Sequence, residues 1–84
     1  MQGSVLIVDD DPLVSGSLHD MILEIGDMRA ETVSNPLDGL HKLHNGGFDL
    51  VFSDIMMPGM SGIEFLREVK HINPWLPVVI ITGF

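Results

Sequence analysis

The segment that best indicates the fold is Val5-Leu6-Ile7-Val8-Asp9-Asp10-Asp11-Pro12, near the start of the chain. Its first four residues are continuously apolar and mostly β-branched, which is typical of a strand covered on both faces of a sheet. Three aspartates end that strand. Pro12 is suited to the first turn of a helix, and Asp11 before it is the expected N-cap. The segment therefore predicts a buried strand, an acidic loop and a helix.

The rest of the sequence continues this alternation of strand and helix. In the first helix, the positions predicted to face inward are Val14, Leu18, Met21, Ile22 and Ile25. Further strands are predicted at residues 28–33, 48–53 and 77–81, the first of these an edge strand and the last buried on both faces. Helices are predicted to begin at Pro36 and after the loop 56–62. This order predicts one α/β domain with a doubly wound parallel sheet.

Composition and net charge exclude several classes of protein and of binding partner. The chain has 84 residues, a hydrophobic fraction of 45% and no cysteine. This fraction predicts a folded core, and the lack of cysteine excludes disulfides and thiolate metal sites. No apolar run reaches the ~20 residues of a membrane-spanning helix. A formal net charge of −8 disfavours contact with nucleic acid or anionic membranes. We expect a soluble, cytoplasmic protein.

Acidic and hydroxyl side chains stand where the predicted strands end. Asp9 and Asp10 follow the first strand. Asp54 ends the third, and Thr82 follows the fourth. Ligands bind beyond the carboxyl ends of the strands in open α/β sheets, so these side chains are expected to form one site. Converging carboxylates repel one another unless they bind a proton or a cation. With oxygen ligands and no cysteine or adjacent histidine, Mg²⁺ is the predicted ion.

This combination is suited to phosphoryl transfer to an aspartate. A divalent cation offsets the repulsion between an incoming phosphate and the carboxylates, and a free carboxylate can act as nucleophile. Structural roles account for some of the acids: Asp11 is expected to cap the helix, and Asp54 alone could be a helix or loop cap. Asp9 and Asp10 are harder to explain in this way, because an unpaired buried charge is costly.

Three segments resemble a known family: Leu6-Ile7-Val8-Asp9-Asp10-Asp11-Pro12, Asp54-Ile55-Met56-Met57-Pro58-Gly59-Met60-Ser61-Gly62 and Ile80-Ile81-Thr82-Gly83. In this order and spacing, at predicted strand ends, they resemble the receiver domain of bacterial two-component response regulators. The resemblance covers the whole chain, residues 1–84. It implies a flavodoxin-like sheet with the strand order 2-1-3-4. It also implies a phosphorylation-dependent signalling switch that assists only its own phosphorylation and dephosphorylation and is not a turnover enzyme.

The resemblance implies a role for each residue of the site. Asp54 would accept a phosphoryl group from a sensor histidine kinase or a histidine phosphotransfer protein and would also contact Mg²⁺. Asp10 would bind the Mg²⁺ directly, and Asp9 would help to hold it, partly through water. The backbone carbonyl of Met56 would be a further metal ligand. Thr82 would turn its hydroxyl toward the phosphoryl oxygens and so couple phosphorylation to a surface change. An output domain is expected in the parent chain, and the ending Ile81-Thr82-Gly83-Phe84 resembles receivers that precede transcription-activating domains, which implies transcription regulation.

The sequence departs from the family pattern at its end. Receivers continue with a fifth strand and a fifth helix, and the fifth strand ends in a lysine that pairs with the phosphoryl group. Here the sequence stops at Phe84. We therefore expect a fragment of a longer protein. The fourth strand would then be an unpaired apolar edge, which predicts that the 84-residue piece in isolation is unstable or self-associates.

Three alternative functions can be weighed on single features. A haloacid-dehalogenase-like phosphohydrolase would have a second aspartate two residues after Asp54, where Met56 stands. A flavodoxin-like cofactor binder would need a first loop with glycine and hydroxyl groups, and Asp9-Asp10-Asp11 would repel its phosphate. A degenerate receiver that serves only as a protein-interaction module stays open if Phe84 is the natural end.

The histidines and the single tryptophan are expected to have no chemical role. His41 and His44 have the i, i+3 spacing that a metal could use, but without a third ligand they are expected to be solvated surface. The other two, His19 and His71, also fall on polar faces of predicted helices. Trp75 is expected to seal the loop that leads into the fourth strand.

Overall fold

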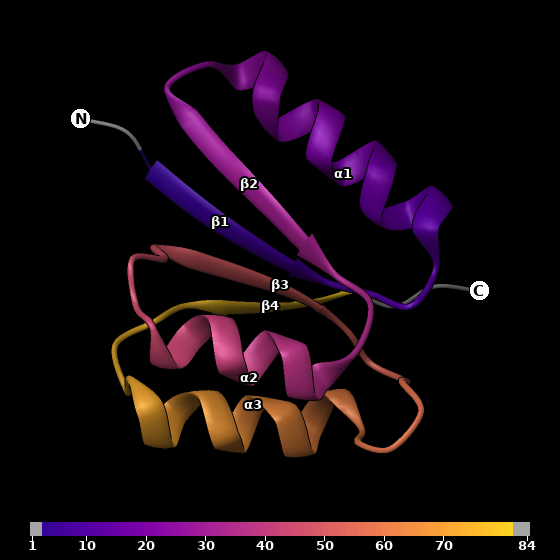
Figure 1. Cartoon of the computed structure of the whole chain (residues 1–84), viewed down its shortest axis with the longest axis vertical. Coiled ribbons are helices and arrows are strands. Elements are labelled where there is room, and N and C mark those ends of the chain that lie inside the picture. The colour runs from indigo at the N-terminus through magenta and orange to yellow at the C-terminus, as the bar shows by residue number, and fades with distance from the viewer. Residues whose placement is uncertain (1–2, 82–84) are drawn as a thin grey trace.

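A computed structural model describes residues 3–81, and Figure 1 shows strands and helices alternating along this part of the chain. In chain order, the elements are β1 (Gly3–Val8), α1 (Pro12–Ile25), β2 (Met28–Val33), α2 (Pro36–His44), β3 (Leu50–Asp54), α3 (Gly62–Ile72) and β4 (Val78–Ile81). The predicted order of elements is confirmed. β3 begins at Leu50 instead of Phe48 and β4 at Val78 instead of Pro77, which is the usual uncertainty of an element's ends.

The strands form one parallel sheet in the order β2-β1-β3-β4. α1 covers one face of the sheet, and α2 and α3 lie side by side on the other (Figure 1). This doubly wound arrangement confirms the predicted α/β class and the predicted strand order. Between residues 3 and 81, no helix has both the length and the apolar character that a bilayer crossing requires.

Alternate residues of β1 supply two hydrophobic cores. Val5 and Ile7 pack with Ile22 on the α1 face of the sheet. Leu6 and Val8 belong to a larger core on the α2 and α3 face. The other buried members of this larger core are Leu43, Val51, Met57, Phe65, Val69 and Leu76. The four β1 side chains are fully buried, as predicted for a strand covered on both faces.

Each helix begins at a polar cap. The carboxylate of Asp11 accepts a hydrogen bond from the amide of Leu13 at 2.9 Å, which confirms the predicted N-cap of α1. Asn35 caps α2 by accepting from the amide of Asp38 at 2.9 Å. Ser61 caps α3 through its hydroxyl oxygen. These caps satisfy backbone donors that have no partner within the helix, and so they define where each helix starts.

The predicted inward face of α1 is only partly correct. Ile22 is buried and Val14 and Leu18 are half-buried, but Met21 and Ile25 are 61% and 73% exposed. α1 packs on β1 and β2 along a narrow line around Leu18 and Ile22. The apolar positions beside that line therefore stay in solvent.

β4 and the loop before it also differ from the prediction. Val78 packs on the larger core, whereas Val79, which pairs with Phe52 of β3, is 43% exposed. Within residues 3–81, β4 is an edge of the sheet, and α1 lies over β1 and β2 instead. The prediction that both faces of β4 are buried is therefore wrong. Trp75 is 88% exposed and does not seal the loop; Leu76, at 5% exposure, fills that position.

Candidate functional site

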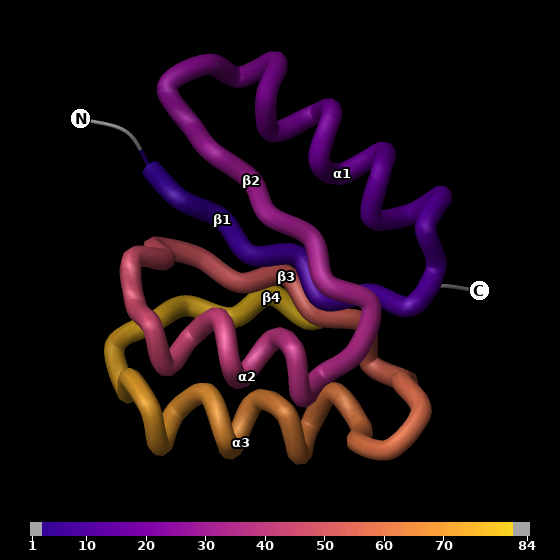
Figure 2. The backbone as a smooth tube through the Cα atoms, in the orientation of Figure 1, coloured from indigo at the N-terminus to yellow at the C-terminus, as the bar shows by residue number. Residues whose placement is uncertain are grey.

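The register of the central strands brings two aspartates together. β1 and β3 pair in parallel with Val8 opposite Ser53. The next residue of each strand segment, Asp9 and Asp54, therefore lies at the same level of the sheet. Side chains alternate along a strand, so both carboxylates are directed to the same face. Figure 2 shows the backbone leaving β1 and β3 at the same end of the molecule.

Asp10 completes a cluster of three carboxylates. One carboxylate oxygen from each of Asp9, Asp10 and Asp54 lies within 4.8 Å of the other two. Asp9 is buried at 4% exposure, Asp54 is half-buried and Asp10 is exposed. An ion about 2.1 Å from each oxygen needs oxygens no more than ~4.2 Å apart, so the three side chains are close to the spacing that a small cation requires. The fold thus brings together the three predicted carboxylate ligands, and their oxygen-only chemistry fits Mg²⁺.

Asp9 forms the buried base of the cluster. The amide of Asp11 donates a hydrogen bond to Oδ1 of Asp9 at 2.8 Å. Burial raises the pKa of Asp9 above its ordinary value, the hydrogen bond from Asp11 opposes this rise, and the charges of Asp54, Asp10 and Asp11 add to it. The ionised carboxylate is therefore destabilised when no cation is bound.

Asp9→Asn should raise the melting temperature of the metal-free protein near neutral pH. Because the pKa of Asp9 is raised in the folded state, its contribution to stability is present below about pH 3.8 and is lost as pH rises through the higher folded-state value. Asparagine keeps the acceptor oxygen for the Asp11 amide but carries no charge. We expect a gain of about 4–8 °C for each kcal/mol of repulsion removed.

Calorimetry with and without Mg²⁺ checks this prediction. Wild-type protein should be stabilised by Mg²⁺, because a ligand that binds only the folded state raises its stability. The Asp9→Asn variant should show much less of this stabilisation. An unchanged melting temperature in the metal-free variant, with the Mg²⁺ response intact, would contradict a charge-repulsion role for Asp9.

Asp54 is one of the residues that line a cleft. Its Oδ1 accepts a hydrogen bond from the amide of Met56 at 3.4 Å, and the chain then turns toward α3. A cleft of about 310 Å³ opens over the carboxylate. Its lining residues are Asp9, Asp10, Asp11, Val14, Asp54, Ile55, Met56 and Ile81. An acidic floor beside a half-buried carboxylate can hold a cation and admit a small oxyanion next to it.

Met56 and Thr82 are the two remaining residues of the predicted site. Met56 lines the same cleft, and its carbonyl stays a predicted metal ligand. Thr82 lies outside the described residues. Ile81, the residue before it, pairs in register with Asp54.

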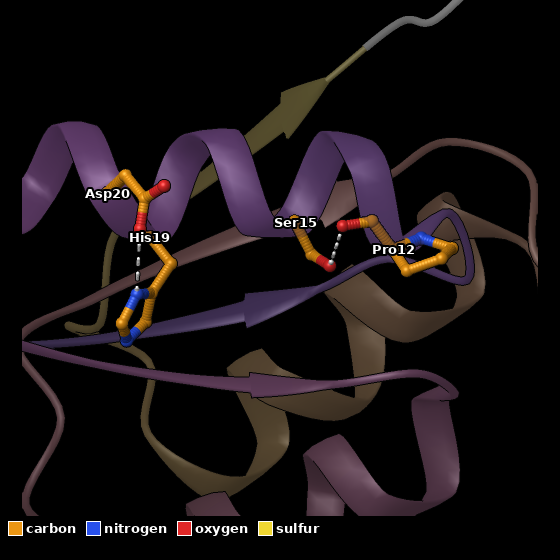
Figure 3. A network of polar contacts seen from close by, with 4 residues as sticks. All are labelled: Pro12, Ser15, His19 and Asp20. Atoms are coloured by element: carbon orange, nitrogen blue, oxygen red, sulfur yellow. Dashed lines mark hydrogen bonds and ion pairs between the residues drawn. The ribbon is translucent and has the colours of Figure 1, made fainter.

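The histidines lie away from the carboxylate cluster. His41 and His44 are exposed on α2, as predicted. On α1, the Nδ1 atom of His19 lies 3.6 Å from a carboxylate oxygen of Asp20, and the hydroxyl of Ser15 donates to the carbonyl of Pro12 (Figure 3). Both contacts join residues of α1 itself. They belong to the helix and give no reason to assign His19 a part in the site.

Two residues that contact the backbone at Asp54 and Ile55 were not predicted from the sequence. Ser53 is fully buried, and its hydroxyl donates to the carbonyl of Asp54 at 3.0 Å. The amide of Gly62 donates to the carbonyl of Ile55 at 2.7 Å. A serine in a strand and a glycine after a loop are ordinary residues in sequence terms. Only the folded chain shows that they contact the segment that carries Asp54.

A parallel sheet with three carboxylates clustered at its strand ends is the arrangement expected of a receiver domain. The chain belongs to the response regulator receiver domain family, whose pattern matches residues 5–84. Receiver domains are phosphorylation switches of two-component systems, and they bind Mg²⁺ at an acidic pocket. The predicted family is therefore confirmed.

Relatives of this chain include bacterial transcription regulators. The transcriptional regulatory protein ZraR of Klebsiella oxytoca is 39% identical over 83 residues, which are 99% of this chain and 18% of that protein. The DNA-binding transcriptional regulator NtrC of Escherichia coli K12 is 36% identical over 82 residues, which are 98% of this chain and 17% of that protein. The chain thus spans less than a fifth of the length of these two relatives.

Solved structures share the fold. The response regulator TrrA from Thermotoga maritima, determined in complex with Mg²⁺-BeF, has a TM-score of 0.92 and 31% identity. The match covers 99% of this chain and 71% of that one. A receiver domain protein from Clostridium thermocellum has a TM-score of 0.86 and 32% identity, covering 96% of this chain and 65% of that one.

Proposed function

We propose that this chain is a phosphorylation-dependent switch in which Asp54 is the phosphoryl acceptor and Asp9, Asp10 and Asp54 hold Mg²⁺. The convergence of these three carboxylates at the ends of β1 and β3 carries the proposal. Asp9 and Asp54 both line the cleft, but Asp54 is half-buried whereas Asp9 is only 4% exposed, so Asp54 is the more accessible carboxylate for an incoming donor. Asp54 is therefore the better acceptor of the two strand-end residues.

The charge of the cleft supports a bound cation. Within the described residues, the lining of the cleft contains four aspartates and no lysine or arginine. Lys42 pairs with Glu31 at 2.9 Å, and Lys70 donates to the carbonyl of Leu76. When bound, Mg²⁺ supplies positive charge that offsets the repulsion between these carboxylates and a phosphoryl group. Asp10 is the exposed ligand, and we propose the carbonyl of Met56 as a further one.

The transfer step uses the carboxylate of Asp54 as nucleophile. One of its oxygens attacks the phosphorus of a phosphohistidine on a sensor kinase or phosphotransfer protein, and an acyl phosphate bond forms. The phosphorus–nitrogen bond breaks, and the histidine nitrogen leaves with the electron pair. The half-burial of Asp54 and the amide of Met56 near its Oδ1 hold the attacking oxygen toward the cleft. The domain is thus a substrate that assists its own modification and is not a turnover enzyme.

We propose that the carboxyl end of β4 couples phosphorylation of Asp54 to a change at the protein surface. The amide of Ile55 donates to the carbonyl of Ile81 at 3.2 Å, so the acceptor segment is tied to the last described residue of β4. We propose that the Thr82 hydroxyl turns toward the phosphoryl oxygens and biases the conformation of this edge. An output domain in the parent protein would sense that change. Within residues 3–81 the outer edge of β4 has no partner strand, and we propose it as a surface for self-association.

A metal and phosphoryl-mimic titration tests the function. Mg²⁺ added to isotopically labelled protein should shift the backbone amide signals of residues 9–11 and 54–57, and BeF₃⁻ added next should shift the second group further. Signals of His41 and His44, which lie on the exposed surface of α2, serve as internal controls and should not move. Chelation of the metal should reverse both changes.

A lack of response to both ligands would contradict the proposal. A folded protein whose site signals respond to neither Mg²⁺ nor BeF₃⁻ would contradict the acceptor role of Asp54. It would instead favour the alternative in which this receiver only binds a partner protein.

A further inference from the structure

We infer that Gly62 and Ser53 are positioning residues that hold the Asp54–Ile55 peptide, and through it the acceptor carboxylate and the predicted Met56 ligand. This inference rests on the proposed function of Asp54. Gly62 is the first residue of α3, and Ser53 lies in β3 directly before Asp54. The acceptor segment, Asp54–Ile55, is therefore contacted by a residue of β3 and by the first residue of α3.

The first observation is steric. A Cβ atom at Gly62 would lie 2.6 Å from the carbonyl oxygen of Asp54 and 2.7 Å from the Cα of Ile55. Both atoms belong to the backbone, so no side-chain rotation can relieve such contacts. Gly62 does not have a positive φ, and its helical conformation is open to alanine. The requirement for glycine is therefore the close approach of α3 to the acceptor segment.

The second observation is the hydrogen bonding of the same segment. The carbonyl of Asp54 accepts from the Ser53 hydroxyl at 3.0 Å, and the carbonyl of Ile55 accepts from the Gly62 amide at 2.7 Å. The amide of Ile55 donates to the carbonyl of Ile81 at 3.2 Å. With both carbonyls and the Ile55 amide engaged, the peptide planes on either side of Ile55 have little freedom to rotate. These planes set the direction in which the chain leaves Asp54 and the position of the Met56 amide, which donates to Oδ1 of Asp54.

Ser53 fits this role better than a packing role. Its side chain is fully buried, where an unpaired hydroxyl would be costly, and its partner is the carbonyl of Asp54. Groups that orient the residues of a metal site typically change affinity about 10- to 100-fold when they are removed. A loss of that size is expected when the restraint on the Asp54–Ile55 peptide is disturbed.

Three glycine-to-alanine variants in three helices provide the test. In Gly62→Ala, the added methyl group meets the acceptor backbone. In Gly39→Ala of α2, its nearest atoms are in the side chains of Val8 and Phe65 at 3.0 and 3.2 Å, so this variant crowds core side chains and not the Asp54–Ile55 backbone. In Gly16→Ala of α1, it meets no atom within 4 Å. The set separates loss of the site from loss of stability.

The measurements are the Mg²⁺-dependent affinity for BeF₃⁻, the melting temperature and the hydrogen exchange of the Ile55 amide. Gly62→Ala should weaken BeF₃⁻ binding about 10-fold or more and speed the Ile55 exchange. Gly39→Ala should lower the melting temperature but keep the affinity. Gly16→Ala should also keep the affinity and should raise the melting temperature slightly, because alanine favours a helix interior over glycine. If Gly62→Ala does not fold, Ser53→Ala replaces it and should weaken binding in the same direction.

Two results would overturn the inference. One is a folded Gly62→Ala or Ser53→Ala protein with wild-type affinity and wild-type protection of the Ile55 amide. The other is a loss of affinity in Gly39→Ala that matches the loss in Gly62→Ala. If wild-type protein binds no BeF₃⁻, the proposed function fails first. Faster Ile55 exchange in Gly62→Ala than in Gly39→Ala would still show the restraint, and equal exchange would refute it.

Discussion

Asp54→Asn should reduce phosphoryl incorporation to the background of an unreacted sample. Asparagine has nearly the same shape as aspartate, but its neutral amide is a poor nucleophile and cannot form the acyl phosphate. The variant also removes one of three carboxylates that lie within 4.8 Å of one another, so Mg²⁺ affinity should fall as well. Incubation with Mg²⁺ and a small acyl phosphate donor, followed by intact-mass spectrometry, measures the phosphorylated fraction.

Asp20→Asn is the matched control for this experiment. Asp20 lies on α1 and is highly exposed, with its carboxylate 3.6 Å from Nδ1 of His19. The same chemical change at this position should leave phosphorylation at the wild-type level. Persistent modification of the Asp54→Asn protein would show that another residue accepts the phosphoryl group, and Asp9 and Asp10 would be the first to examine.

Phe65→Ala should produce the largest loss of stability among single substitutions in the core. Phe65 is fully buried in the larger core, and its ring lies so close to α2 that a Cβ atom at Gly39 would be 3.2 Å away. Truncating a buried phenylalanine typically costs about 3–5 kcal/mol, because transfer energy is lost and a cavity remains. Natural domains are stable by only about 0.05–0.15 kcal/mol per residue, so this chain should be largely unfolded by the change.

Urea unfolding followed by circular dichroism measures this effect. Ile63→Ala is the control from the same helix, since Ile63 is 49% exposed and its truncation should cost far less. The midpoint of unfolding should fall strongly for Phe65→Ala and slightly for Ile63→Ala. Equal midpoints for the two variants would mean that α3 is not held to the sheet through Phe65.

Much of the candidate site could be predicted from local sequence. The apolar run of β1 followed by aspartates, and a third strand ending at Asp54, already place carboxylates at strand ends. The general rule for open α/β sheets then predicts their convergence. What the sequence could not predict is the support beneath Asp54, because a buried serine and a glycine at a helix start have no chemical signature until their neighbours are known.

The sequence alone was sufficient for the element order, the α/β class and the N-cap of α1, because these depend on patterns of a few residues that act locally. Exposure was decided only by the tertiary structure. Met21, Ile25 and Val79 have the apolar character of core residues, yet they are 61%, 73% and 43% exposed. Burial depends on which element covers which surface. The need for glycine at position 62 was also decided by the tertiary structure. A Cβ atom there would lie 2.6 Å from the carbonyl oxygen of Asp54, because the start of α3 packs against the end of β3.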